Sequence, residues 1–366
     1  MNKQFKKSIL SVIAVLLLLT ISLGLMTACD KEPALGDDES KESSSDSELV
    51  GSASGDGESN ADTDAPTTDD TKAKIILLNG TTGMGAANMM AAKDPQFSFE
   101  IATAADVVSA AMIGGEADIA AVPTNLASVL YNKTKGKVKV AAINTKGVLY
   151  ILENGNSITS FESLKGKTVY VPGLGSNPEY LLKYLCAKNG LEVGKDITID
   201  GTTYPSPDEL TTAVVAGKAD IALLPEPKVT VIKSKNANIN VALDITAEWE
   251  KACGKENTLV QGCIIVRTEF AENHPEVVEK FLTQYKASIE KIATDAETSA
   301  TNMAELGILP SKAVALKAIP GCNICYIEGS EMKTALSYLF GALYEIEPKS
   351  VGGAVPDDAI YYTRNK

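Results

Sequence analysis

One sequence pattern occurs twice in this chain, as GGEADIAAVPTN at Gly114–Asn125 and as AGKADIALLPEP at Ala216–Pro227. Both copies contain Gly-x-Ala-Asp-Ile-Ala-x-x-Pro, and both follow an amphipathic run. The spacing of about a hundred residues is too long for a stacked repeat and suits one copy in each of two domains. We interpret each copy as the end of a helix, a glycine turn and a buried strand that ends in a loop.

The segments around both copies alternate between strand-like and helix-like patterns. Before the first copy the order is KIILLNG, TTGMGAANMMAAK, FSFEIAT and ADVVSAAMIGG, which we interpret as strand, helix, strand and helix. Before the second copy KTVYVPG, LGSNPEYLLKYLCAKNG, DITIDGTTY and SPDELTTAVVAGK repeat that order, with Ser206 as a helix cap. Such alternation favours a parallel sheet with helices on both faces. The predicted fold is therefore α/β, with two doubly wound lobes.

The C-terminal part of the chain does not repeat this cycle. A strand pattern, QGCIIVRTEF, is followed by long helical patterns that include HPEVVEKFLTQYKASIEKIATDAETSATNMAELG and GSEMKTALSYLFGALYEI. Because connections prefer nearby elements, we expect this part to return and cover the first lobe. The prediction is a lobe 1 from residues 74–157 plus 262–366, a lobe 2 from residues 158–261, two crossovers and a cleft between the lobes.

The first 28 residues read as a secretory signal peptide. Lys3, Lys6 and Lys7 precede an apolar run, and small residues precede Cys29. The stretch LMTAC resembles a bacterial lipobox, which implies that residues 1–28 are removed and that Cys29 carries lipid. An uncleaved anchor helix or a plain signal peptide remains an alternative. In each case the rest of the chain is expected outside the cytoplasm.

Residues 29–73 are predicted to be a disordered, acidic linker behind the lipidated cysteine. Ser, Gly, Thr, Asp and Glu dominate it, so it lacks the apolar surface that a folded segment has to bury. Fourteen acidic residues stand against three lysines between Asp30 and Ala73, a net charge of −11, and the whole chain carries −13. The charge therefore belongs mainly to the linker and says little about the partner.

Ligands of open α/β sheets bind beyond the carboxyl ends of the strands, where loops and helix N-termini converge. Glycine lets the backbone approach a ligand there, and free N–H groups at a helix start favour oxygen atoms with negative charge. Each such loop taken alone is also an ordinary turn, so the prediction depends on four equivalent loops in two lobes. The candidate ligand-binding residues are Thr81, Thr82, Gly83, Met84, Gly85, Thr124, Asn125, Gly175, Ser176, Asn177 and Glu226.

The candidate loops carry few cations and no nucleotide-binding signature. GTTGMGA is neither G-x-G-x-x-G nor a phosphate-binding loop that ends in Lys-Ser or Lys-Thr. The absence of charged clamps favours a small monoanion or a neutral polar ring. Glu226 can accept N–H bonds from a ligand, or it is part of a rigid exposed turn. Tyr150, Tyr180 and Trp249 are either stacking surfaces or packing residues. No basic stripe with interleaved aromatic residues occurs, so we expect no nucleic-acid partner.

Catalytic and metal-binding patterns find little support. The one histidine, His274, precedes Pro275 at a predicted helix start, and no serine elbow or His-Glu-x-x-His pattern occurs. Five cysteines follow Cys29, an odd number for an exported protein. Disulfides within Cys322/Cys325 or Cys253/Cys263, zinc, and buried free thiols stay open, with free thiols as the default. We predict no cofactor, no metal and no enzymatic activity.

Six stretches carry a family resemblance: LMTAC, GTTGMGA, GEADIAAVPTNLASVLYNK, SFESLKGKTVYVPGLGSNPEYLLKYL, GKADIALLPEPKVT and GGAVPDDAIYY. With them the chain resembles the substrate-binding lipoproteins of ABC importers, in the nitrate/sulfonate/taurine-type and pyrimidine-precursor-like (NMT1/THI5-like) branch. The resemblance covers Cys29 and residues 74–362. FESLKGKTVYVPG with a downstream GKADIALLPEP is specific for the superfamily and says little about the ligand.

This resemblance implies a type II periplasmic-binding fold whose two lobes close on a solute. The family's cleft positions correspond here to Thr82–Gly85, Thr124–Asn125, Gly175–Asn177 and Glu226. The implied partners are a small solute, the permease subunits of an ABC importer and, through Cys29, the bilayer. The protein is then a lipid-anchored monomer on the extracytoplasmic face of the cell membrane. The alternatives are an extracytoplasmic enzyme on the same scaffold and a solute sensor that works without a permease.

Overall fold

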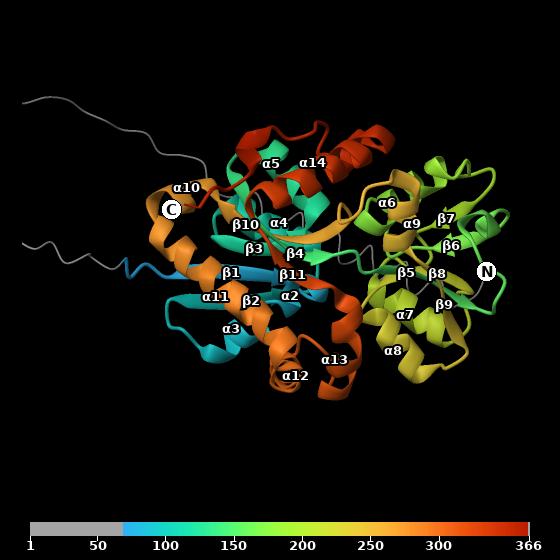
Figure 1. The fold of residues 1–366 in the computed structure, drawn as a ribbon, viewed down its shortest axis with the longest axis horizontal. Coiled ribbons are helices and arrows are strands. Elements are labelled where there is room, and N and C mark those ends of the chain that lie inside the picture. The colour runs from blue at the N-terminus through green and yellow to red at the C-terminus, as the bar shows by residue number, and fades with distance from the viewer. Residues whose placement is uncertain (1–68, 365–366) are drawn as a thin grey trace, which may run out of the picture. The chain divides into compact units, whose positions relative to one another are not determined.

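A computed structural model describes residues 69–364 of the chain. The predicted signal peptide, Cys29 and all but the last residues of the predicted linker lie outside this range. None of the helices in the described range has the length and apolar composition that crossing a bilayer requires. Within it, the chain forms two mixed sheets, each covered by helices, which lie side by side in Figure 1.

The sheet of lobe 1 has six strands in the order β11-β4-β10-β3-β1-β2. β1 pairs in parallel with β2 and with β3, whereas β10 runs antiparallel to both of its neighbours, β3 and β4. The strands are β1 (Ala73–Leu78), β2 (Phe97–Ala102), β3 (Ile119–Pro123), β4 (Val138–Lys146), β10 (Val260–Arg267) and β11 (Ile324–Ile327).

Helices from both ends of the described chain cover this sheet. The N-terminal ones are α2 (Thr81–Met84), α3 (Ala87–Ala92), α4 (Ala105–Gly114) and α5 (Thr124–Thr134). The C-terminal ones are α10 (Thr268–Asn273), α11 (Pro275–Thr294), α12 (Ala296–Glu305), α13 (Lys312–Ala318), η2 (Ile319–Cys322), α14 (Gly329–Ile346), η3 (Pro348–Val351) and η4 (Asp358–Ile360). The C-terminal part therefore does return to lobe 1, as predicted.

The sheet of lobe 2 has five strands in the order β7-β6-β8-β5-β9. Its strands are β5 (Leu149–Asn154), β6 (Thr168–Tyr170), β7 (Thr198–Asp200), β8 (Ile221–Pro225) and β9 (Ile239–Asp244). Its helices are η1 (Phe161–Leu164), α6 (Asn177–Lys188), α7 (Pro207–Val215), α8 (Lys228–Lys235) and α9 (Ile245–Cys253). α7 starts with a capping box: the Ser206 hydroxyl accepts from the N–H of Glu209, whose carboxylate accepts from the N–H of Ser206.

Two expectations about the sheets need correction. β5 was expected in lobe 1, within residues 74–157, but it pairs antiparallel with β8 and β9 and so belongs to lobe 2. The first crossover therefore lies between Lys146 and Leu149. The sheets were also expected to be parallel, whereas β5 and β10 both run against β8 and β3. The chain enters β5 and β10 directly from the other lobe. Neither strand is therefore reached through a crossover helix of its own lobe, which a parallel strand requires.

The twin pattern has the predicted structure in both lobes. In each copy a helix, α4 or α7, ends before a glycine with positive φ, Gly115 or Gly217. The strands that follow, β3 and β8, are buried along their length up to the terminal proline. Each motif thus marks one helix, one turn and one central strand of its lobe.

The two lobes share one hydrophobic cluster. Leu181 and Tyr184 of α6 belong to the same buried cluster as Leu336 and Phe340 of α14. Trp249 of α9 has no exposed surface and lies between the lobes: its ring centroid is 4.8 Å from Tyr184 and 6.1 Å from Tyr338 of α14. On the other side of the molecule α13 contacts α8. Figure 1 shows α14 between α5 and α6.

Candidate functional site

The carboxyl ends of the two motif strands meet at one crossover. The N–H of Val148 donates to Gln261 Oε1 at 2.6 Å, and its carbonyl accepts from the N–H of Glu226 at 2.9 Å. Gln261 lies on β10, next to the residue that pairs with Pro123, and Glu226 follows Pro225 directly. The ends of β3 and β8 are therefore connected through a single residue between the lobes.

Glu226 is buried at this junction and is contacted from both lobes. Its two carboxylate oxygens accept from the N–H and the hydroxyl of Thr230, each at 3.0 Å. A Cβ on Gly321, which belongs to η2 of lobe 1, would lie 3.1 Å from Glu226 Cγ. Burial raises the pKa of Glu226, because withdrawal from water outweighs the hydrogen bonds from Thr230 and the nearby charge of Lys233. The Glu226 carboxylate is thus already hydrogen-bonded within the protein, by Thr230.

The turn after β1 connects to a buried polar cluster of lobe 1. Thr82 donates through Oγ1 to the carbonyl of Leu78 at 3.0 Å, and its own carbonyl accepts from Asn144 Nδ2 at 3.0 Å. Asn144 Nδ2 also donates to the hydroxyl of Tyr285 at 2.9 Å. The sequence patterns did not single out Asn144 or Tyr285, since each lies far from Thr82 in the chain and within its own strand or helix.

The neighbours of Thr82 on α2 point in different directions, because α2 is a single helical turn. Thr81 and Gly83 are buried, and a Cβ on Gly83 would lie 3.0 Å from the carbonyl oxygen of Leu78. Met84 has no exposed surface and belongs to the hydrophobic cluster around α12 and α13. A Cβ on Gly85 would lie 2.5 Å from the Tyr285 hydroxyl. Met84 and Gly85 therefore face the interior of lobe 1.

The start of α5 contacts the C-terminal segment. Thr124 Oγ1 donates to the carbonyl of Val260 at 2.8 Å, and Asn125 Nδ2 donates to the carbonyl of Ser350 at 3.4 Å. One turn further along α5, Ser128 donates to the carbonyl of Val351 at 2.7 Å. Ser350 and Val351 form part of η3 and were not predicted as site residues. No local pattern marks them, since only the tertiary fold brings η3 to α5.

The start of α6 is occupied by its own side chains. Ser176 is the N-cap: its Oγ accepts from the N–H of Glu179 at 3.5 Å and donates to the carbonyl of Gly173 at 2.8 Å. The N–H of Gly175 donates to Glu179 Oε2 at 2.5 Å, and Glu179 Oε1 lies 2.7 Å from Lys183 Nζ. The position at which a helix N-terminus attracts an anion thus already holds a carboxylate.

Asn177, the next residue, is different. The residue is only 8% exposed, and its side-chain atoms Nδ2 and Oδ1 are buried without a hydrogen-bond partner. The hydroxyl of Ser350 is also buried without a partner. Most buried polar groups in proteins are paired, so these atoms are available to a ligand or to water.

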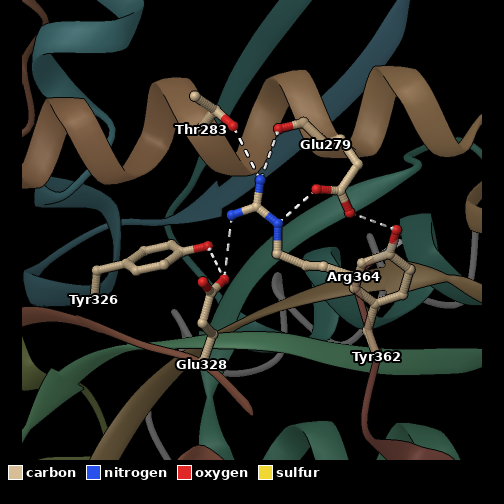
Figure 2. Close-up of polar contacts among 6 residues, drawn as sticks. All are labelled: Glu279, Thr283, Tyr326, Glu328, Tyr362 and Arg364. Atoms are coloured by element: carbon tan, nitrogen blue, oxygen red, sulfur yellow. Dashed lines mark hydrogen bonds and ion pairs between the residues drawn. The ribbon is translucent and has the colours of Figure 1, made fainter. Parts of the chain in front are cut away.

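The chain has two arginines, and both are engaged away from the predicted site residues. Arg267 Nη2 lies 2.8 Å from Asp118 Oδ1 in lobe 1. Arg364 lies at the C-terminus of the described chain, where Figure 2 shows its guanidinium between Glu279 and Thr283 of α11 and Glu328. Lys228, beside the loop after β8, lies 2.5 Å from Asp208.

The remaining chemically reactive side chains of the described range are one histidine and five cysteines. His274 Nδ1 lies 2.8 Å from Asp69 Oδ2. The five cysteines of the described range are free thiols, and burial raises the pKa of Cys186 to about 12 and that of Cys325 to about 11. Within residues 69–364, no three His, Cys, Asp or Glu side chains are arranged to hold a metal ion.

Three surface grooves lie away from the crossover. They run beside α4 and β1, between α3 and α11, and between α4 and α10. None of these three is lined by a predicted site residue. The candidate site therefore rests on the junction of the lobes and not on a groove of one lobe.

A family model described as NMT1/THI5 like matches residues 108–299, which is more than half of the chain. The match begins in α4, includes both copies of the twin pattern and the whole of lobe 2, and ends in α12. A comparison with curated proteins finds no match.

Solved structures show the same fold. An ABC transporter from Parabacteroides distasonis is 24% identical, with a TM-score of 0.67, over 81% of this chain and 100% of that chain. The periplasmic aliphatic sulphonate binding protein SsuA from Escherichia coli is 17% identical, with a TM-score of 0.65, over 82% and 94%. A Candida albicans protein with the generic periplasmic binding protein fold is 12% identical, with a TM-score of 0.54, over 79% and 93%.

Proposed function

Because the chain belongs to the NMT1/THI5-like family, we propose that it is the solute-binding component of an ABC importer, which captures a small polar solute between two lobes. One observation carries the proposal: the carboxyl ends of β3 and β8 meet at Val148, where residues of both lobes converge. In α/β sheets these strand ends are the place where ligands bind. Solved structures with the same fold include an ABC transporter and a periplasmic aliphatic sulphonate binding protein.

The solute would gain contacts from both lobes. Thr81, Asn125 and Ser350 belong to lobe 1, and Asn177 belongs to lobe 2. Met84 and Gly85 are left out, since they face the interior of lobe 1. A solute that touches both lobes binds the closed arrangement more tightly than the open one, so it shifts the population toward closure. The closed molecule then presents a composite surface to the permease.

The N-terminal predictions fit this role and remain proposals. Removal of residues 1–28 and lipidation of Cys29 would hold a monomeric receptor on the extracytoplasmic face of the membrane. The predicted linker, residues 29–73, ends earlier than expected, because Asp69 bonds to His274 and Ala73 begins β1. Residues 29–68 would give the receptor reach as a flexible tether. We place the domain boundaries of the described chain by the sheets, with lobe 1 as residues 73–147 plus 260–364 and lobe 2 as residues 148–259.

Native mass spectrometry of the mature protein, extracted from its own membranes, tests the proposal. We expect a bound small molecule, and the mass of the N-terminal peptide shows whether Cys29 carries lipid. Re-addition of the released solute at 100 times its Kd should raise the free energy of unfolding by about 2.7 kcal/mol. A protein that carries no solute and gains no stability from the solutes of its growth medium would contradict the proposal.

The same experiment addresses the enzyme alternative. We propose binding without turnover, since His274 is engaged by Asp69, and burial raises the pKa of the thiols of Cys186, Cys263 and Cys325. The solute should therefore leave the protein with the mass it had on entry, even after long incubation. A product of different mass, formed in proportion to the protein, would favour an enzyme.

A further inference from the structure

The unpaired donor and acceptor of the Asn177 side chain indicate which chemical group of a ligand it can bind. Nδ2 is a donor with no acceptor, and Oδ1 is an acceptor with no donor, although the side chain is more than nine-tenths buried. Asn177 is the first residue of α6, a helix of 12 residues. A group that presents an acceptor and a donor side by side pairs with both atoms at once.

Ser350 adds a third uncommitted polar atom, from lobe 1. Its backbone is fixed on α5 by the bond from Asn125 Nδ2 to its carbonyl, while its hydroxyl has no partner. The segment that carries Ser350 leaves α14, which packs on α6 in lobe 2. Lys188 of α6 and Glu345 of α14 also form an ion pair at 3.4 Å. Asn177 and Ser350 therefore belong to opposite lobes, Asn177 at the start of α6 and Ser350 in the segment that follows the helix packed on α6.

The charges around Asn177 disfavour an anion. Glu179 fills the anion position at the start of α6, and Lys183 neutralises that same carboxylate. Burial raises the pKa of the Tyr180 hydroxyl on α6, and the negative charges of Glu179 and, less strongly, of Glu347 just before η3 raise it further. A sulfonate brings three acceptor oxygens, a negative charge and no donor. It would leave Asn177 Oδ1 unpaired and would bring a further negative charge to a helix start that Glu179 already fills.

We propose that this site takes an uncharged solute with an adjacent hydrogen-bond donor and acceptor, as in a carboxamide, lactam or urea group, and that Asn177 and Ser350 read that group. Asn177 Nδ2 donates to the solute carbonyl, Asn177 Oδ1 accepts from its N–H, and the Ser350 hydroxyl completes the contact from lobe 1. The inference rests on the proposed receptor function and names its substrate class. It also sets this chain apart from the sulphonate-binding protein of the same fold.

Matched probes test the substrate class. Thermal shift and calorimetry on the mature protein compare nicotinamide, nicotinate and pyridine-3-sulfonate, which share one ring, together with 2-pyrrolidone and N-methylurea against methanesulfonate. We expect the tightest binder to be an amide, lactam or urea, with a Kd at least ~10-fold below that of the matched anion. A ~10-fold difference in Kd corresponds to the free energy of about one hydrogen bond. An anion as the tightest probe, or no neutral probe with a Kd below about 10 mM, overturns the inference.

Variants separate a binding role from a structural one. Asn177→Ala should weaken the best neutral probe by at least ~10-fold and leave the free protein as stable as before, or more so, because it removes two unpaired buried atoms. Ser350→Ala should weaken the same probe by about 3–10-fold. Ser337→Ala is the control, since its exposed hydroxyl bonds only to Tyr361. Full affinity in Asn177→Ala overturns the inference.

Different experimental results contradict the substrate class and the receptor function. Tight binding of a sulfonate or carboxylate leaves a solute receptor and removes only the substrate class. A protein that binds neither series and carries no solute from its membranes loses both.

Discussion

Glu226 and Glu153 are two buried glutamates whose environments act in opposite directions. For Glu226, burial raises the pKa. For Glu153, burial also pushes the pKa upward, but hydrogen bonds from Ser157 and Ile158 outweigh it and the pKa is lowered. A raised pKa in the folded state adds stability at low pH that is lost as the pH rises through the raised value. A lowered pKa adds stability at high pH that is lost as the pH falls through the lowered value.

The first prediction uses this pair. Glu226→Gln should raise the free energy of unfolding at pH 7, because it removes the cost of a buried charge, and should leave it nearly unchanged at pH 4. Glu153→Gln should lower stability at pH 7, since the amide loses hydrogen bonds that favour the charged form. Urea unfolding at both pH values measures the effects. Equal shifts of the same sign in the two variants would contradict the assignment.

The second prediction concerns the close approach at Gly262. A Cβ there would lie 2.4 Å from Asn144 Oδ1 and 2.7 Å from Thr82 Cγ2, so Gly262→Ala has to displace the buried polar cluster. We expect a loss of about 1–3 kcal/mol in the free energy of unfolding. Gly341→Ala in α14 is the matched control, because nothing lies within 4 Å of its Cβ and alanine favours a helix by up to about 1 kcal/mol.

Among the elements, those specified by local pattern were predictable. The twin pattern gave β3, β8 and the helices before them, and the Ser206 cap marked the start of α7. β5 was assigned to the wrong lobe because VLYIL has the same apolar character in either sheet, and only its antiparallel pairing decides. η3 escaped prediction for a similar reason: its contact with α5 joins residues more than 200 positions apart.

The predicted site residues show the same limit. The loops after β1, β3, β6 and β8 follow from strand ends, so the patterns locate the turn that contains Asn177. Whether a side chain in such a loop is free or engaged depends on its neighbours in space. Glu179 beside Gly175 and Thr230 beside Glu226 are engaged within their own helices, which the residue types alone do not reveal.

The third prediction concerns the C-terminal segment that Figure 2 shows on α11. Arg364 donates to Glu279 at 2.5 Å, to Glu328 at 3.3 Å and to Thr283 at 3.0 Å, and Tyr362 donates to Glu279 at 3.1 Å. Because these charged groups are partly buried and share one network, Arg364→Ala should cost about 1–2 kcal/mol of unfolding free energy.

Lys333→Ala is the control for Arg364→Ala. Lys333 forms a single pair with Asp358 at 2.7 Å, and both side chains are largely exposed. Such pairs contribute between zero and about 1 kcal/mol. Denaturant titration of both variants should rank Arg364→Ala as clearly more destabilising, and an equal effect would mean that the network adds nothing beyond one surface pair.

At the scale of the whole molecule, the two lobes are not independent. The cluster that contains Leu181 and Tyr184 of α6 continues into Leu336 and Phe340 of α14 without a polar boundary. A continuous apolar core of this kind links the stabilities of its parts.

The fourth prediction follows from the shared core. Calorimetric unfolding of the mature protein should show one transition, with agreement between the calorimetric and van't Hoff enthalpies. Two resolved transitions, or a lobe 2 fragment of residues 148–259 that folds on its own, would contradict the shared core. Saturation with a solute should shift the single transition upward as a unit.

The position of Trp249 has a practical consequence. It is the one tryptophan of the chain, and its indole is buried between a tyrosine of lobe 2 and a tyrosine of α14. Its emission spectrum is therefore an intrinsic optical gauge of the lobe junction, free of background from other indoles. A red shift on opening, or its absence, can be recorded in a cuvette without attaching any dye.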